Sequence, residues 1–339
     1  MKSYQPGEIR NFAIVGHASS GKTMLGEAML AASGAINRLG SITNGTTVSD
    51  YHESEHKRQI SIHASLLHTE WQGKKFNILD TPGYLDFISE GLGALRVGDF
   101  ALIVVHANHG VVIGTEQVWN YATRYGIPKM FVINAMDKEH ANFDQVLKQI
   151  RSRFGEKVFP LAVPANPGPG FNQVLDVLRS EMVTYQTDGT GQYQEVPAGK
   201  EWEEEVSTLH KQLIEYIAES DDSLLEKFFE QGGLSEEEMR SGIHKAVQNQ
   251  SVIPLFCTAA ESNVGVARLM DFIAKYGSSP VDRQKVKALD NNDNEVEISL
   301  TDPEPVLYVF KTISEPQAGD LSYFRLYSGS IRIGMDMYN

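Results

Sequence analysis

The stretch "FAIVGHASSGKT", residues 12–23, joins a short apolar run to a glycine-rich loop. An apolar run of this kind is typical of a strand that is buried on both faces. The loop has glycines at positions 16 and 21, followed by Lys22 and Thr23. Glycines at this spacing let the backbone curl, so that successive N–H groups and the next helix N-terminus point at one anion. The stretch therefore predicts a strand, a phosphate-binding loop and a helix.

The predicted roles within this loop follow from the chemistry of each side chain. Lys22 would neutralise the β and γ oxygens of a bound nucleotide, and the Thr23 hydroxyl would coordinate Mg²⁺. The remaining contacts would come mainly from the backbone. The residues expected to contact phosphate are Gly16, His17, Ala18, Ser19, Ser20, Gly21, Lys22 and Thr23.

Further apolar runs alternate with helical patterns along the chain. Strands are predicted at 76–80, 100–105, 129–134 and 252–257, and helices at 22–33, 86–97, 114–125, 142–153 and 263–275. This alternation implies an α/β fold with a mainly parallel sheet and helices on both faces. The stretch "LLHTEWQGKKFNILD" predicts a hairpin that turns near Gly73 and adds one antiparallel strand at the sheet edge.

Two polar motifs follow predicted strands. In "DTPG", residues 80–83, Asp80 would hold Mg²⁺ through water and the N–H of Gly83 would reach a γ-phosphate. In "NAMD", residues 134–137, the Asp137 carboxylate can accept both N1–H and the 2-amino group of guanine. Adenine does not offer this pair of donors, so the motif favours GTP over ATP.

Composition divides the chain into units. Residues 1–160 and 251–278 are predicted to form the nucleotide-binding domain, interrupted by an inserted subdomain at 161–250. Residues 195–250 hold fourteen acidic and five basic residues, a net charge of −9 out of −14 for the whole chain. A helix in this subdomain is predicted to begin at the capping box Ser235 to Glu238. Residues 279–305 are predicted to be a linker, and 306–339 the start of a β-barrel that the chain leaves incomplete.

Residues 34–60 lack clear periodicity and are rich in Gly, Ser, Thr, Asn and charge. Long loops inside compact domains are usually functional, so this segment is a candidate switch loop. We expect it to be mobile without a ligand, because few of its residues can bury apolar surface.

No apolar run approaches the ~18 residues of a membrane span, and the N-terminus lacks the apolar core of a signal peptide. A single cysteine, Cys257, cannot form an internal disulfide. We therefore expect a cytoplasmic protein with no membrane partner.

Taken together, these motifs resemble a Ras-like GTP-binding domain, and nearly the whole chain resembles the elongation factor G family of translational GTPases. The similarity rests on "GHASSGKT", "RQISI", "DTPGYLDF", "NAMD", "CTAAESNVGV", the insert and "LSYFRLYSGSIRIG". It implies a paralogue cut within its second domain and a monomer that binds GTP or GDP with Mg²⁺. The implied partner is the ribosome, through ribosomal RNA and a stalk protein that meets the insert. The implied reaction is hydrolysis of GTP to GDP and phosphate, during translocation or a related elongation step.

Several positions depart from the family pattern. The switch-loop threonine that binds magnesium falls on Ser61, and the lysine that covers the guanine base falls on Ala135. The loop that contacts guanine through backbone N–H groups falls on Ala259 and Ala260. Ser19 replaces an aspartate of the phosphate loop. The resemblance thus implies Thr23, Ser61 and Asp80 at the metal, and Asn134, Asp137, Ala259 and Ala260 at the base.

Tyr84 occupies the place of the family histidine that orients the attacking water. With Lys22 and Gly83 it completes the implied catalytic set. A tyrosine is longer, has one terminal hydroxyl and stays neutral near pH 7, so it would orient water from a different position. We expect GTP to bind and its hydrolysis to be slow. Three alternatives remain at this stage: a fully active translocase, a ribosome-binding factor that uses guanine nucleotide only structurally, and a Tyr84 that packs against the switch loop.

Overall fold

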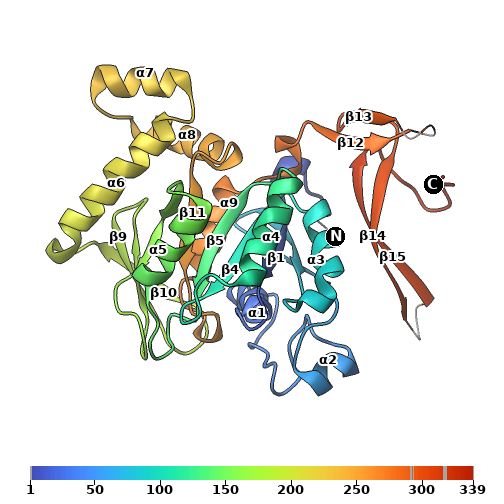
Figure 1. Ribbon diagram of the computed structural model, residues 1–339, viewed down its shortest axis with the longest axis horizontal. Coiled ribbons are helices and arrows are strands. Elements are labelled where there is room, and N and C mark those ends of the chain that lie inside the picture. The colour runs from blue at the N-terminus through green and yellow to red at the C-terminus, as the bar shows by residue number, and fades with distance from the viewer. Residues whose placement is uncertain (1, 291, 293, 316–318, 339) are drawn as a thin grey trace.

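A seven-stranded sheet forms the centre of the computed structural model, which describes residues 2–290, 292, 294–315 and 319–338 (Figure 1). The strand order is β2-β3-β1-β4-β5-β11-β6, and every pairing is parallel except that of β2 with β3. The predicted fold class and antiparallel edge strand are confirmed, whereas the three-residue strand β6 was not predicted. The strands are β1 (Ile9–Gly16), β2 (Ser65–Trp71), β3 (Lys74–Asp80), β4 (Phe100–His106), β5 (Lys129–Asn134), β6 (Val158–Pro160) and β11 (Ile253–Cys257).

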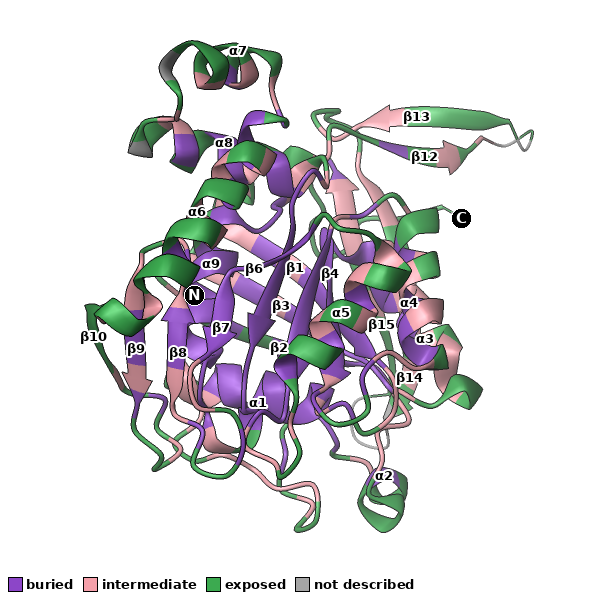
Figure 2. Cartoon of the chain, turned by 60° about the vertical axis from the view of Figure 1, so that its left-hand side comes forward, coloured by how far each residue is buried: buried purple, intermediate pink, exposed green. Residues whose placement is uncertain are grey.

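Helices cover both faces of this sheet. The helices α1 and α9 pack together on one face, and α3, α4 and α5 lie on the other (Figure 1). The helix α1 is buried along most of its length, and Figure 2 shows it as an almost continuous purple segment. Their bounds are α1 (Lys22–Ala32), α3 (Ile88–Val97), α4 (Ile113–Arg124), α5 (Phe143–Phe154) and α9 (Val266–Tyr276), close to the predicted ranges.

Strand register determines which residues meet at one edge of the sheet. Gly16 at the end of β1 pairs with Val104, and His106 at the end of β4 pairs with Asn134. Asp80 ends β3 opposite Ile14 of β1. Because the carboxyl ends of parallel strands face the same way, the phosphate loop, "DTPG" and "NAMD" all emerge at this edge.

Three aromatic rings pack in the core toward the amino ends of β1, β3 and β4. The ring of Phe12 stacks on Phe100 with centroids 4.9 Å apart and meets Phe76 edge-on at 5.8 Å. All three side chains are fully buried. Burial of such a ring contributes roughly 1.5–3 kcal/mol to the stability of the fold. This packing holds β1, the strand that leads into the phosphate loop, in the sheet.

The inserted segment builds its own α/β unit, as predicted. Its four-stranded sheet has the order β10-β9-β8-β7, and in the helical part that follows α6 packs against both α7 and α8. The capping box at Ser235 and Glu238 is present at the start of α8. The elements are β7 (Ala162–Pro164), β8 (Gln173–Asp176), β9 (Glu181–Tyr185), β10 (Tyr193–Pro197), α6 (Glu203–Ala218), α7 (Asp222–Gln231) and α8 (Glu236–Gln248).

The segment 279–305, which is predicted to be a linker, contains a β-hairpin. Strands β12 (Lys285–Leu289) and β13 (Glu295–Ser299) pair antiparallel. Lys285 and Glu297 form a cross-strand ion pair at 2.7 Å, and Lys287 and Glu295 one at 3.2 Å. The polar composition that suggested a linker thus reflects charged pairs on a narrow, solvated hairpin.

A second antiparallel pair follows, β14 (Val306–Glu315) with β15 (Gly319–Ser328). It contacts the nucleotide-binding unit through Lys311, whose Nζ donates to the Ala64 carbonyl at 2.5 Å and lies 3.3 Å from Glu90. Arg325 pairs with the buried Asp99 at 2.6 Å. The division into units stays a prediction; residues 1, 291, 293, 316–318 and 339 of those units lie outside the described residues.

The short helices complete the chain. A six-residue helix, α2 (Glu53–Arg58), interrupts the predicted irregular loop at 34–60. In the part of the chain that the structure describes, 3-10 turns lie at element ends: η1 (Pro6–Glu8), η2 (Leu85–Phe87), η3 (Lys200–Trp202), η4 (Ala260–Ser262) and η5 (Pro280–Asp282). No helix within the described residues is long and apolar enough to cross a membrane.

Candidate nucleotide-binding site

The phosphate loop has the curled backbone that its sequence predicts. Ser19 and Gly21 both have left-handed backbone angles, with φ of 61° and 87°. At Gly21 a Cβ would also overlap the amide of Asn134, so glycine is required there on two grounds. The helix α1 begins directly afterwards at Lys22. The loop therefore places a helix N-terminus behind a left-handed turn, an arrangement suited to an anion.

Lys22 and His17 lie inside this loop. The Lys22 ammonium donates to the His17 carbonyl at 2.8 Å, and burial lowers the pKa of Lys22 to about 8. The His17 ring packs against Gly114 at the start of α4, and burial, followed by the charge of Lys22, lowers its pKa as well. A neutral, packed His17 is a structural part of the loop. Lys22, in contrast, is a cation held without an anionic hydrogen-bond partner among the described residues.

The three predicted magnesium residues come together. The Thr23 hydroxyl donates to Asp80 Oδ2 at 2.8 Å and lies 3.0 Å from the Ser61 hydroxyl. Burial raises the pKa of Asp80, and its Oδ1 is buried without a hydrogen-bond partner among the described residues. An acceptor in this state fits a water-mediated cation, because metal-bound water donates strongly.

Two further residues at this cluster were missed by sequence analysis. Ser49 donates to Asp80 Oδ2 at 2.6 Å. Asp50 beside it is only 4% exposed, and burial raises its pKa to about 6. Ser49 and Asp50 are adjacent in the sequence of the switch loop. No sequence spacing rule connects them to Asp80, which lies about thirty residues later at the end of β3.

The loop after β3 rests directly on the phosphate loop. A Cβ at Gly83 would lie 2.5 Å from the Ala18 nitrogen and would also overlap the Lys22 ammonium. Only glycine permits this approach. The neighbouring Tyr84 is 42% exposed, and its carbonyl accepts from Phe87 at 3.1 Å to begin η2. The alternative in which Tyr84 packs on the switch loop stays a prediction.

Asn134 ties the base-recognition loops to the phosphate loop. Its Nδ2 donates to the Ser20 carbonyl at 3.1 Å, and its Oδ1 accepts from the Thr258 hydroxyl and the Ala260 N–H, both at 3.0 Å. The side chain is 3% exposed. Asn134 thus links three segments that are far apart in the sequence, and sequence analysis assigned it only to the base.

Asp137 has a carboxylate oxygen, Oδ1, that accepts no hydrogen bond from the described residues. Its Oδ2 lies 3.9 Å from the Lys138 ammonium, whereas its buried Oδ1 accepts from no described residue. Lys138 pairs more closely with Glu261, at 2.5 Å. A buried carboxylate oxygen with unused acceptor capacity is what a base edge with two N–H donors requires.

The predicted backbone donors to the base already have partners. The Ala259 N–H donates to the Val264 carbonyl at 3.0 Å, and the Ala260 N–H to Asn134 Oδ1. Ala135 has a left-handed backbone with φ of 66° and is 8% exposed. A purine carbonyl at this position would therefore share the Ala260 N–H with Asn134.

The switch loop is held by buried carboxylates. Glu27 of α1 accepts from the backbone N–H groups of Gly40 at 2.9 Å and Val48 at 3.0 Å. Glu55 accepts from Ile62 at 2.9 Å and His63 at 3.0 Å. These hydrogen bonds add to the packing of Ile36, Leu39 and Ile42 against the core, and hydropathy does not reveal them. Its mobility without a ligand stays a prediction.

Comparison with known proteins agrees with this geometry. Residues 7–279 match the model of the family described as elongation factor Tu GTP binding domain. A crystal structure of a protein from Thermus thermophilus superposes with a TM-score of 0.84 at 31% sequence identity. That match covers 95% of this chain and 46% of the other, so this chain spans about half the length of that protein. Since the family model spans well over half of its residues, the chain belongs to the elongation factor Tu GTP-binding domain family.

Proposed function

We propose that this chain binds GTP and GDP at the sheet edge formed by the phosphate loop, "DTPG" and "NAMD". The observation that carries the proposal is a pair of buried carboxylate oxygens without partners among the described residues, Asp80 Oδ1 and Asp137 Oδ1. Asp80 Oδ1 belongs to the carboxylate that accepts from the Thr23 hydroxyl, and Asp137 follows Asn134 in the same loop. Buried acceptors left unpaired are costly, and a nucleotide with its magnesium would satisfy both at once.

The metal part of the site depends on the nucleotide. No group of three or more His, Cys, Asp or Glu residues that could hold a metal occurs among the described residues. Thr23, Ser61 and Asp80 offer two hydroxyls and one carboxylate, and Mg²⁺ requires about six oxygen ligands. The donor set therefore fits a Mg²⁺ ion that is shared with phosphate oxygens and water. When bound, the ion would neutralise charge on the β and γ oxygens.

Guanine selectivity follows from Asp137. The carboxylate can accept N1–H and the 2-amino group together, and adenine offers a different pattern. Asn134 holds the loop of Ala260 against the phosphate loop, so the base and phosphate contacts are fixed relative to one another. Discrimination by such paired bonds reaches about 10⁴-fold or more.

Entry of a γ-phosphate requires Gly83 to move. Gly83 lies against both Ala18 and the Lys22 ammonium, the group that would neutralise that phosphate. We expect the γ-phosphate of GTP to separate the two loops, whereas GDP, which lacks this group, leaves them in contact. This gives the loop at 80–87 two nucleotide-dependent positions, and the Gly83 N–H becomes a donor to phosphate in one of them.

We further propose that the chain is a paralogue of elongation factor G that acts on the ribosome and hydrolyses GTP slowly. The motifs, the insert and the β14–β15 pair support this assignment. Phosphoryl transfer depends mainly on positioning and charge stabilisation. Tyr84 is exposed and its hydroxyl has no hydrogen-bond partner among the described residues, so this hydroxyl is not preorganised to orient water. Misplacing that water lowers the rate and leaves binding intact.

Isothermal titration calorimetry with GTP, GDP and ATP in millimolar Mg²⁺ tests the binding proposal. We expect both guanine nucleotides to bind and ATP to bind at least about 100-fold more weakly. Comparable ATP binding would overturn the role of Asp137. No guanine binding would favour a ribosome-binding factor without nucleotide chemistry.

Single-turnover hydrolysis on ribosomes tests the role of Tyr84, in the native protein and in Tyr84→His. We expect histidine to increase the rate by about 100-fold or more, in the range of a general-base contribution. GTP affinity should stay unchanged. A fast native rate that histidine does not improve would identify a fully active translocase instead.

A further inference from the structure

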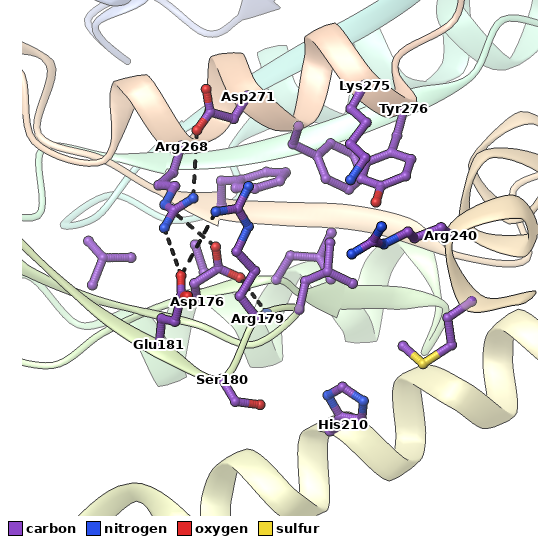
Figure 3. A pocket seen from close by; sticks show the side chains of 17 residues that line it. Asp176, Arg179, Ser180, Glu181, His210, Arg240, Arg268, Asp271, Lys275 and Tyr276 are labelled. Atoms are coloured by element: carbon purple, nitrogen blue, oxygen red, sulfur yellow. Dashed lines mark hydrogen bonds and ion pairs between the residues drawn. The ribbon is translucent and has the colours of Figure 1, made fainter. Parts of the chain in front are cut away.

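Cations with little exposed side chain join separate segments of this chain. Arg268 of α9 pairs with Asp176 and Glu181 of the insert, and these side chains come together in Figure 3. That cluster holds the insert against α9. Lys311 of β14 instead joins the β14–β15 pair to a segment beside the proposed magnesium site. It lies outside residues 7–279, the part of the chain that matches the family model.

The segment 61–64 connects the proposed magnesium ligand Ser61 to strand β2. Its last residue, Ala64, is held on both sides of its backbone. The Ala64 N–H donates to Glu90 Oε2 of α3 at 2.7 Å, and the Ala64 carbonyl accepts from Lys311 Nζ at 2.5 Å. Lys311 Nζ also lies 3.3 Å from the same Glu90 oxygen. The Lys311–Glu90 ion pair therefore fixes the position of Ala64.

This ion pair is largely shielded from water. The Lys311 side chain is 9% exposed and that of Glu90 is 28% exposed. Exposed ion pairs contribute little because solvent screens them, whereas removal of one partner from a shielded pair leaves the other charge without its partner. Substitution of Lys311 should therefore loosen the hold on Ala64 measurably.

The β14–β15 pair is held against the nucleotide-binding unit near Lys311 and at a second place. Beside Lys311, a Cβ at Gly93 of α3 would lie 3.1 Å from the Phe310 carbonyl, so α3 and β14 are in close contact. At the second place Arg325 of β15 pairs with Asp99. Asp99 precedes β4 and so lies toward the edge of the sheet opposite the phosphate loop. Arg325 thus offers a matched contact that holds the pair without reaching the magnesium site.

We propose that Lys311 is a positioning residue for the magnesium site. By holding Ala64 together with Glu90, it keeps segment 61–64 in the conformation that places the Ser61 hydroxyl 3.0 Å from the Thr23 hydroxyl. Lys311 acts through the backbone of Ala64 and not by contact with the ion. The inference rests on the proposed role of Ser61 at magnesium, whereas the hold on Ala64 can be tested without nucleotide.

Hydrogen–deuterium exchange of the intact chain without nucleotide tests this hold. In Lys311→Gln the amides of residues 62–64 should exchange about tenfold faster or more, the factor expected for loss of one hydrogen bond from a charged donor. Lys311→Arg keeps the charge and several donors, so its exchange should be slower than that of Lys311→Gln. The matched control Arg325→Gln should speed exchange in β15 and leave residues 62–64 unchanged. Unchanged exchange in Lys311→Gln, or an equal increase at 62–64 in Arg325→Gln, overturns the proposal.

Magnesium titration of GTP binding tests the consequence for the site. Lys311→Gln should need about threefold more Mg²⁺ or higher for half-maximal GTP binding, because segment 61–64 occupies the competent arrangement for a smaller fraction of the time. In excess Mg²⁺ its GTP affinity should return to that of the native chain. An unchanged Mg²⁺ requirement despite faster exchange overturns the positioning of Ser61. A native chain that binds no GTP overturns the proposed function and the magnesium part of this inference together, while exchange still decides whether Lys311 holds segment 61–64.

Discussion

Replacement of Asn134 by alanine is the sharpest test of how the site is assembled. The side chain makes three hydrogen bonds to two separate segments, to Ser20 of the phosphate loop and to Thr258 and Ala260 of the loop after β11. It belongs to a motif that sequence reasoning assigns to the base. The structure instead predicts that its main contribution is to the stability of the empty site.

The magnitude follows from the groups that the substitution leaves unpaired. The Ala260 N–H and the Ser20 carbonyl belong to residues that are 2% and 3% exposed, so water cannot easily replace the lost amide. The Thr258 hydroxyl can rotate, but it also loses its acceptor. A buried polar group left unpaired costs about 1–3 kcal/mol, and we expect the free energy of unfolding to fall by about 3–5 kcal/mol.

Urea unfolding without nucleotide, followed by tryptophan fluorescence, measures this loss. Asp137→Ala is the matched control, because it truncates an acidic side chain in the same loop whose Oδ1 has no partner among the described residues. We expect the control to change stability by less than about 1 kcal/mol. Guanine nucleotide binding should weaken in both variants. If the two variants have the same unfolding free energy, or if Asn134→Ala is as stable as the parent, the structural role of Asn134 is refuted.

Three further predictions concern other parts of the chain. In Asp137→Asn an amide donor replaces one carboxylate acceptor, so the affinity for guanine nucleotides should fall about 100-fold. Calorimetry should then show that the variant binds xanthine nucleotides more tightly than guanine nucleotides. A variant that still prefers guanine nucleotides would contradict the base assignment. Gly83→Ala inserts a methyl group against Ala18, so the free energy of unfolding should fall by about 1–3 kcal/mol. The affinity for GTP should fall more than the affinity for GDP. An equal loss of both affinities would contradict a contact between Gly83 and the γ-phosphate. A hydrogen bond to Asp282 at 2.9 Å raises the pKa of His244, so this pair stabilises the fold fully below the ordinary histidine pKa of about 6.5 and less as pH rises through the folded pKa. The stability lost in His244→Gln should therefore be larger near about pH 5.5 than near about pH 8.5 in urea unfolding, and a pH-independent difference would rule out this linkage.

Much of the central fold was predictable from local sequence. Apolar runs of five or six residues identified the parallel strands, because each strand is buried on both faces and needs an unbroken hydrophobic stretch. The same rule failed for β6, which has three residues, and for the hairpin β12–β13, whose strands are solvated and charged. A hydropathy pattern reveals a strand only where several consecutive side chains are buried. The strand β6 is too short to form such a pattern, and the hairpin β12–β13 buries few side chains.

The side chains expected to carry the chemistry could be predicted from the sequence alone. Lys22, Thr23, Asp80 and Asp137 are recognisable because phosphate, metal and base recognition depend on residue type and on position at a strand end. The contacts that hold these groups in place are seen only in three dimensions: the Asn134 hydrogen bonds, the Glu27 contacts to the switch loop and the approach of Gly83 to the phosphate loop. Such contacts join residues that are tens of positions apart, and no local period records them. They exist because parallel strands deliver distant loops to one edge of the sheet, where buried polar groups must pair with one another.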